Sequence, residues 1–251
     1  KELNVSIYAK PEFHWGRMFQ IRLGLEQGID VSWYAKPEFN EWQMWQIRDG
    51  LENELDVSCY ANPEFNIHQM AQIVLGLEKN IDVSLYANPK FNENQMQEIR
   101  YGLENKVDVS IYANPEYNWR QMAQYLDTLI EGIDTTLLDT PGLQDYHMRA
   151  IKEFKHDYSE DIDCSCFANP NLDEETVSEM MEEIVRFKRD PKYFSDPRLN
   201  SRQVEMIIIG LRAKLDVTKY NNPELDHEKM KLLGEDLERG LPVELYNNPK
   251  F

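Results

Sequence analysis

Hydrophobic residues recur along the chain in a pattern with a period of 26 residues. Within one period, Met44, Ile47 and Leu51 follow one another at intervals of three and four residues. Because an α-helix turns by about 100° per residue, these side chains fall within about 60° of one another on a helical wheel. The same spacing returns later as Met70, Ile73 and Leu77 and as Met96, Ile99 and Leu103. Each period therefore predicts one amphipathic helix with a buried apolar face.

The polar residues between these helices indicate where each element begins and ends. Asp30 suits the N-cap of a short helix that runs to Tyr34, and Pro37 prevents that helix from continuing. Asn40 suits the N-cap of the longer helix, and Gln43 three residues later completes a capping box. The sequence therefore predicts a short helix, a proline turn and a longer helix in every period.

Glycine recurs inside the longer helices, at the edge of the apolar face. Gly50 has equivalents in four other repeats, namely Gly24, Gly76, Gly102 and Gly210. Glycine within a helix costs about 1 kcal/mol relative to alanine, so another contact must compensate. We expect close approach of a neighbouring helix at these positions.

Prolines mark the repeats along the whole chain. They stand at 11, 37, 63, 89, 115 and 141 with a constant step of 26 residues, and resume at 170, 197, 223 and 249. This pattern predicts an all-α fold, an α-solenoid of two-helix repeats of about 26 residues. We expect five regular repeats over 1–133, a degenerate repeat with an insertion over 134–161, and divergent repeats over 162–251. The prediction is one continuous solenoid, and a break into two domains near 134–162 is the alternative.

The longer helices differ most from repeat to repeat at four positions, which lie one, two, five and nine residues after the N-cap. On a helical wheel these positions face away from the apolar stripe. They include four of the five tryptophans. The candidate partner-binding residues on this face are Trp15, Phe19, Trp42, Trp45, His68, Tyr101, Trp119 and Arg120.

Exposed aromatic residues on stacked helices would form an apolar patch, and such patches mark interaction sites. The alternative is that neighbouring elements cover this face, so that the tryptophans belong to the core. Variation favours recognition, because a packing layer between identical units should itself repeat. A second variable position lies in the short helix. It remains apolar in five repeats, as Ile7, Trp33, Cys59, Leu85 and Ile111, and is therefore predicted to be core.

The negative charge of the chain limits the kinds of partner that it is expected to bind. The formal net charge is −18, spread along the chain, so the surface should repel phosphates. Nucleic acid is therefore an unlikely partner, and no run of about 20 apolar residues predicts a membrane span. Three cysteines without ligand or disulfide spacing, and no visible signal peptide, favour a cytoplasmic protein. The chain lacks an initiator Met and ends in half a repeat, so we expect it to be cut from a longer array.

No group of residues predicts catalysis, a metal site or a cofactor. The five histidines, His14, His68, His147, His156 and His227, stand alone and are expected at the surface. Pairs such as Glu182 and Glu183 are expected on solvated helix faces. Phosphate-binding glycine loops and nucleophile motifs are absent. We therefore expect a protein that is not an enzyme.

The repeat string Asp-Val-Ser-x-Tyr-Ala-(Lys/Asn)-Pro-Glu-Phe-Asn-x-x-Gln-Met-x-Gln-Ile-Arg-x-Gly-Leu-Glu resembles tandem repeats in large proteins of gut Firmicutes, often on mobile elements or prophages. The resemblance covers 3–133 well and 162–251 loosely, whereas 134–161 departs from it. It implies an origin and a repeat architecture, but no reaction.

The leading hypothesis is a monomeric protein- or peptide-binding module that uses the variable aromatic face. One alternative is a structural scaffold or spacer within a larger protein. Another is an acidic nucleic-acid mimic that inhibits a DNA-binding enzyme.

Overall fold

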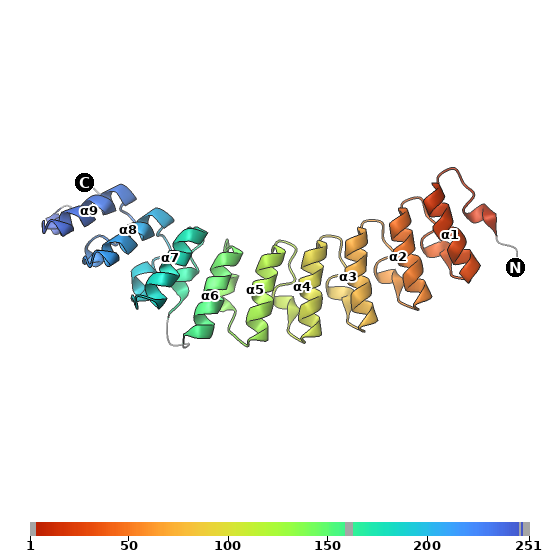
Figure 1. The fold of residues 1–251 in the computed structure, drawn as a ribbon, viewed down its shortest axis with the longest axis horizontal. Coiled ribbons are helices and arrows are strands. Elements are labelled where there is room, and N and C mark those ends of the chain that lie inside the picture. The colour runs from red at the N-terminus through yellow and green to blue at the C-terminus, as the bar shows by residue number, and fades with distance from the viewer. Residues whose placement is uncertain (1–3, 159–162, 246, 248–251) are drawn as a thin grey trace. The chain divides into compact units, whose positions relative to one another are not determined.

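The computed structural model describes residues 4–158, 163–245 and 247. Over these residues the secondary structure is helical and contains no strand, which confirms the all-α prediction. Within each unit, consecutive long helices pack against each other, as expected of a helical repeat solenoid (Figure 1). The chain forms two compact units, Lys1–Leu126 (unit 1) and Asp127–Phe251 (unit 2). Continuity of the solenoid between them stays a prediction.

Long α-helices alternate with single turns of 3-10 helix through both units. The long helices are α1 (Trp15–Gln27), α2 (Glu41–Glu52), α3 (Ile67–Glu78), α4 (Glu93–Glu104), α5 (Trp119–Ile130), α6 (Asp145–Asp157), α7 (Glu174–Val185), α8 (Ser201–Arg212) and α9 (His227–Glu238). The 3-10 helices are η1 (Val5–Ile7), η2 (Val31–Trp33), η3 (Val57–Cys59), η4 (Val83–Leu85), η5 (Val109–Ile111), η6 (Thr136–Asp139), η7 (Ser165–Phe167), η8 (Pro191–Phe194), η9 (Val217–Lys219) and η10 (Val243–Leu245).

The short helices begin where the sequence predicts. Asp56 accepts a hydrogen bond of 3.1 Å from the backbone N–H of Ser58, and the Ser58 hydroxyl donates to the same carboxylate. These hydrogen bonds lower the pKa of Asp56. Pro63 soon follows, so the segment forms three residues of 3-10 helix in place of a longer α-helix.

The long helices begin at the predicted capping boxes. Asn40 accepts from the N–H of Gln43 at 3.0 Å, and the Gln43 side chain accepts from the N–H of Asn40 at 2.8 Å. The Gln43 amide also donates to the carbonyls of Pro63 and Phe65, at 3.1 and 2.7 Å. The same four contacts recur around Gln69, Gln95 and Gln203. One side chain therefore caps its own helix and binds the backbone of the next repeat.

The helices end in a left-handed turn at a fixed place in the repeat. The N–H of Leu55 donates to the carbonyl of Gly50 at 2.9 Å, and Glu54 between them has φ of 57°. This is the Schellman arrangement, which satisfies carbonyls at the helix end. The left-handed residue is Gly28, Gly132 and Gly240 in three other repeats, but Asn80, Lys106, Lys188 and Lys214 elsewhere.

The predicted apolar stripe forms most of the core between the layers. Met44 and Ile47 are fully buried, whereas Leu51 is only half-buried, as are its equivalents Leu77 and Leu103. Leu51 lies in the last turn of α2, next to the end of the helix. The third member of the stripe is therefore less buried than predicted.

The recurring glycines make room for a tyrosine of the following short helix. A Cβ on Gly50 would lie 1.8 Å from the Tyr60 hydroxyl, which donates to the carbonyl of Gln46 at 3.4 Å. Tyr60 is fully buried, and burial raises the pKa of its hydroxyl. The same arrangement joins Gly24, Gly76, Gly102 and Gly210 to Tyr34, Tyr86, Tyr112 and Tyr220. This confirms the predicted close approach.

Two polar residues that we expected at the surface are buried in unit 2. His147 is fully buried because it takes the place of the capping-box glutamine, and its Nδ1 accepts from the N–H of Gln144 at 3.1 Å. Glu183 is fully buried because it accepts a hydrogen bond of 2.7 Å from Nε of Arg212 on α8. Those two surface predictions were wrong, since single residues do not reveal such partners.

Candidate functional site

The variable face is the outward surface of α1 to α5 that carries the eight candidate partner-binding residues. Each of the eight is exposed: Trp15, Phe19, Trp42, Trp45, His68, Tyr101, Trp119 and Arg120. Trp15 and Trp42 are the most open, with 70% and 63% of their surface exposed. The aromatic rings are therefore at least partly open to water, as expected of an interaction surface.

Exposure of Trp42 follows from the geometry of α2. Trp42 is the second residue after the Asn40 cap, and its neighbours Gln43 and Met44 both point inward and are buried. Helix α2 packs against α1 on one side and α3 on the other, as the ribbon of Figure 1 shows. Trp42 therefore stays open although its helix has neighbours on both sides.

Contacts between helices show which positions face the preceding repeat. Arg48, eight residues after its cap, donates from Nε to Gln20 of α1 at 3.2 Å and from a terminal nitrogen to Gln27 at 3.1 Å. Arg22 stands at the same position of α1 and is exposed. Within the described part of the chain, no long helix packs on that side of α1.

Trp15 and Phe19 lie on this uncovered side of α1, where they line a shallow apolar hollow with Tyr8, Met18 and Arg22. Since α1 is the first long helix of unit 1, no preceding long helix of the described chain covers this side of it. The exposure of Trp42 and Trp45 has no such cause. We therefore place the centre of the candidate site on α2.

Several rings of the variable face carry an arginine from the same helix. The guanidinium of Arg100 lies 4.6 Å from the centre of the Tyr101 ring, and that of Arg120 lies 5.1 Å from the Trp119 ring. Cation–π contacts of this kind keep part of a ring covered. Among the described residues, neither Trp42 nor Trp45 has an aromatic or cationic ring contact of this kind. No cationic side chain of the described residues therefore covers the exposed part of either α2 ring.

Helix α3 interrupts the aromatic surface. At its variable positions it carries Ile67, His68, Ala71 and Leu75, of which Leu75 is 38% exposed. The face is therefore aromatic on α1 and α2, aliphatic on α3, and aromatic again at Tyr101 of α4. A partner would meet distinct side chains on each repeat.

The apolar position of the short helices is not core, contrary to prediction. Trp33, Leu85 and Ile111 are 37%, 45% and 39% exposed, and Cys59 and Ile7 are half-buried. A 3-10 helix of three residues buries Val31 before Trp33 and Tyr34 after it, so the residue between them turns outward. These residues form a second exposed apolar row on the short-helix layer.

The described residues hold no cluster of side chains suited to a metal ion, and none of their helices is long and apolar enough to cross a membrane. Burial raises the pKa of the thiols of Cys59, Cys164 and Cys166, which disfavours the nucleophilic thiolate. Burial therefore makes these three cysteines poorly suited to act as nucleophiles.

No family model matches the chain, and comparison with the curated proteins and with the solved structures finds no match either.

Proposed function

We propose that the chain is a protein- or peptide-binding module in which Trp42 and Trp45 are the main contact residues. The observation that supports this most directly is the 63% exposure of Trp42 on a helix that is packed on both sides. Removing apolar surface from water contributes about 25 cal/mol per Å², so an uncovered indole is a large unused source of binding energy.

The residues around the two tryptophans indicate the chemistry of the partner. Glu41 precedes Trp42, and Asp49 lies one helical turn after Trp45; both carboxylates are half-buried. The chain as a whole has a formal charge of −18. A peptide that combines apolar side chains with lysine or arginine would complement this surface in both respects.

The spacer alternative is favoured by one feature, the interruption of the aromatic surface at His68 and Ala71 of α3. A spacer does not require an aromatic surface that continues from repeat to repeat. The two functions differ in a measurable way, because a spacer would show no selective loss of binding when the tryptophans are removed.

A displayed library of random peptides, selected on the immobilised chain, tests the proposal even though the natural partner is unidentified. We expect enriched peptides to carry apolar and basic residues. Trp42→Ala and Trp45→Ala should each weaken their binding about tenfold or more, which corresponds to roughly 1.4 kcal/mol and is typical of hot spots. Both variants should melt within a few degrees of the parent, because the side chains are exposed.

Trp33→Ala is the matched control, since it removes a tryptophan that is 37% exposed on the other layer. The proposal fails if this variant loses as much affinity as Trp42→Ala. It also fails if the selection enriches no peptide, or if Trp42→Ala unfolds the protein without a selective loss of binding.

A further inference from the structure

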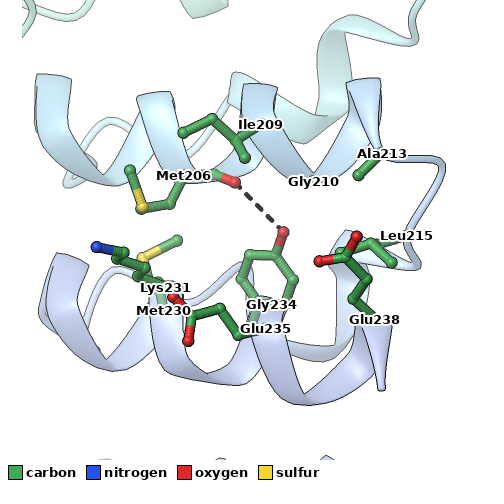
Figure 2. Close-up of a pocket in the computed structure, with 11 residues that line it drawn as sticks. Met206, Ile209, Gly210, Ala213, Leu215, Met230, Lys231, Gly234, Glu235 and Glu238 are labelled. Atoms are coloured by element: carbon green, nitrogen blue, oxygen red, sulfur yellow. Dashed lines mark hydrogen bonds between the residues drawn. The ribbon is translucent and has the colours of Figure 1, made fainter. Parts of the chain in front are cut away.

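A hollow of about 300 Å³ opens between α8 and α9 in unit 2, and its surface is mainly apolar (Figure 2). Met206 and Ile209 line it from α8, and Met230 lines it from α9. The carboxylates of Glu235 and Glu238 stand at its rim on α9. A volume of this size is at the lower end of the range of about 300–1,000 Å³ that is usual for small-molecule sites.

The hollow lies where, in two helices of unit 1, an arginine side chain crosses to the preceding helix, and α9 lacks that side chain. Arg48 and Arg100, eight residues after their caps, cross to Gln20 and Gln72, six residues after the caps of the preceding helices, at 3.2 Å in both cases. In α9 the residue eight after the cap Asp226 is Gly234. In α8 the residue six after its cap is Met206.

The carboxylate that pairs with these arginines is nevertheless retained. Arg48 and Arg100 bind Glu52 and Glu104, each twelve residues after its cap. The residue twelve after Asp226 is Glu238, and within the described part of the chain it has no ion pair. Helix α9 thus keeps the acid and lacks its cation.

Other charges favour a cation at the same end of the hollow. Helices α8 and α9 run in the same direction, and Ala213 and Glu238 mark their last turns (Figure 2). Helix C-termini attract positive charge. Glu235 adds a second carboxylate, whereas the one basic lining residue, Lys231, lies at the opposite end.

We propose that the hollow between α8 and α9 binds an amphipathic cation, a guanidinium on a hydrocarbon stem, in the place that arginine occupies in α2 and α4. The guanidinium pairs with Glu238, and the stem lies against Met206, Ile209 and Met230. Because Met206 replaces the glutamine acceptor, the site suits a ligand with more hydrocarbon than arginine itself.

The test uses n-hexylguanidinium as the probe, with n-hexylurea as its neutral isostere and guanidinium chloride as the head group alone. Methyl signals of Met206 and Met230 in methionine-labelled protein report binding by NMR titration. We expect n-hexylguanidinium to shift both signals in a saturable way, n-hexylurea to bind at least tenfold more weakly, and guanidinium chloride to give no saturable shift at the same concentrations.

Two substitutions in the site sharpen the result. Gly234→Arg introduces the residue found at this position in α2 and α4 and should abolish binding; a Cβ at this position meets nothing closer than 3.8 Å, so the fold should tolerate it. Glu238→Gln should reduce the affinity for n-hexylguanidinium to that for n-hexylurea. Glu205→Gln removes the same charge from an exposed residue of α8 that does not line the hollow, and should leave the affinity unchanged.

The proposal is overturned if n-hexylurea binds as tightly as n-hexylguanidinium, if Glu238→Gln has no more effect than Glu205→Gln, or if a folded Gly234→Arg variant still binds. None of these outcomes bears on Trp42 and Trp45, so this site and the variable face are tested separately.

Discussion

Unit 1 and unit 2 are built on one repeat frame, but some repeats of unit 2 replace the contacts that recur in unit 1, whereas Gly210 with Tyr220 and Gln203 keep them. In unit 1 the same contacts recur, such as the Tyr60 hydroxyl that packs over Gly50. In unit 2 the first repeat has Thr128 at the glycine position and Leu138 at the tyrosine position, both buried. Leucine has no hydroxyl, so the glycine is no longer needed.

Other positions in unit 2 also change together with their surroundings. His147 replaces the capping glutamine and still accepts from the N–H of its cap, Gln144. Glu183 stands ten residues after its cap, where the regular repeats have glycine, and is matched by Arg212 of the next helix. The comparison teaches that the two-helix repeat is retained in a divergent sequence when residues in contact with each other change together.

The largest expected effect comes from removing a core methionine in either unit. Met96→Ala in α4 and Met148→Ala in α6 should each cost about 2–5 kcal/mol in the free energy of unfolding, because both side chains are almost fully buried and leave a cavity. Hydrogen exchange should show opening first in the altered repeat and its neighbours. Uniform opening of the whole chain would mean that the units are not built of separable repeats.

A smaller effect should come from filling the glycine position. Gly102→Ala should cost about 1–3 kcal/mol, because its Cβ would lie 2.0 Å from the Tyr112 hydroxyl. Adding Tyr112→Leu, which introduces the residue that stands at the equivalent position 138, should recover part of the loss. A double-mutant cycle from urea unfolding measures the coupling, and we expect more than about 0.5 kcal/mol. If the free-energy changes of the two substitutions simply add, the two positions are not coupled and the inference is wrong.

Acid should distinguish the two units through His147. Burial lowers the pKa of His147, and backbone contacts only partly oppose this. The histidine therefore stabilises the fold fully above its unfolded pKa of about 6.5, and this contribution is lost as pH falls below that value. His147→Gln, which restores the residue of the regular repeats, should make the free energy of unfolding less sensitive to pH below about 6.5.

Exposed His156 is the control for that measurement. The hydrogen bond from its ring to Asp157 raises its pKa, so its contribution is present at low pH and is lost as pH rises. His156→Gln should therefore change the pH profile in the opposite sense. Identical pH profiles of the parent and His147→Gln would show that the buried histidine does not limit acid stability.

The smallest expected effect is a gain at the left-handed position. Lys106 in unit 1 and Lys214 in unit 2 both have φ of 61°, a conformation in which a side chain is strained. Lys106→Gly and Lys214→Gly should each stabilise the fold by about 0.5–1 kcal/mol, because the relief exceeds the entropy cost of glycine. Thermal melting measures both. A gain in one unit only would show that the turn is not equivalent in the two.

The repeat and its helix boundaries could be predicted because they depend on local signals. Asn40 with Gln43 and the following proline turn act within a few residues of sequence. The exposure of Trp33 could not be predicted in the same way. Its position is apolar in five repeats, and a position that is always apolar resembles a core position. Its environment depends on how Val31 and Tyr34 orient the turn.

The two candidate sites also differ in how far the sequence alone could predict them. The variable face could be predicted, since helix periodicity alone places Trp42 opposite Met44. The hollow between α8 and α9 could not, because its signal is the joint loss of an arginine at Gly234 and a glutamine at Met206. That loss becomes visible only after the structure shows which positions of neighbouring helices touch.

The capping glutamines have a consequence for how such arrays can change. Gln43, Gln69 and Gln95 bind the next repeat through its backbone carbonyls, so this junction does not depend on which side chains follow. Recombination in steps of 26 residues could duplicate, delete or reorder whole units and preserve these bonds. New combinations of surface residues could thus arise by shuffling existing units, without waiting for compensating mutations at every boundary.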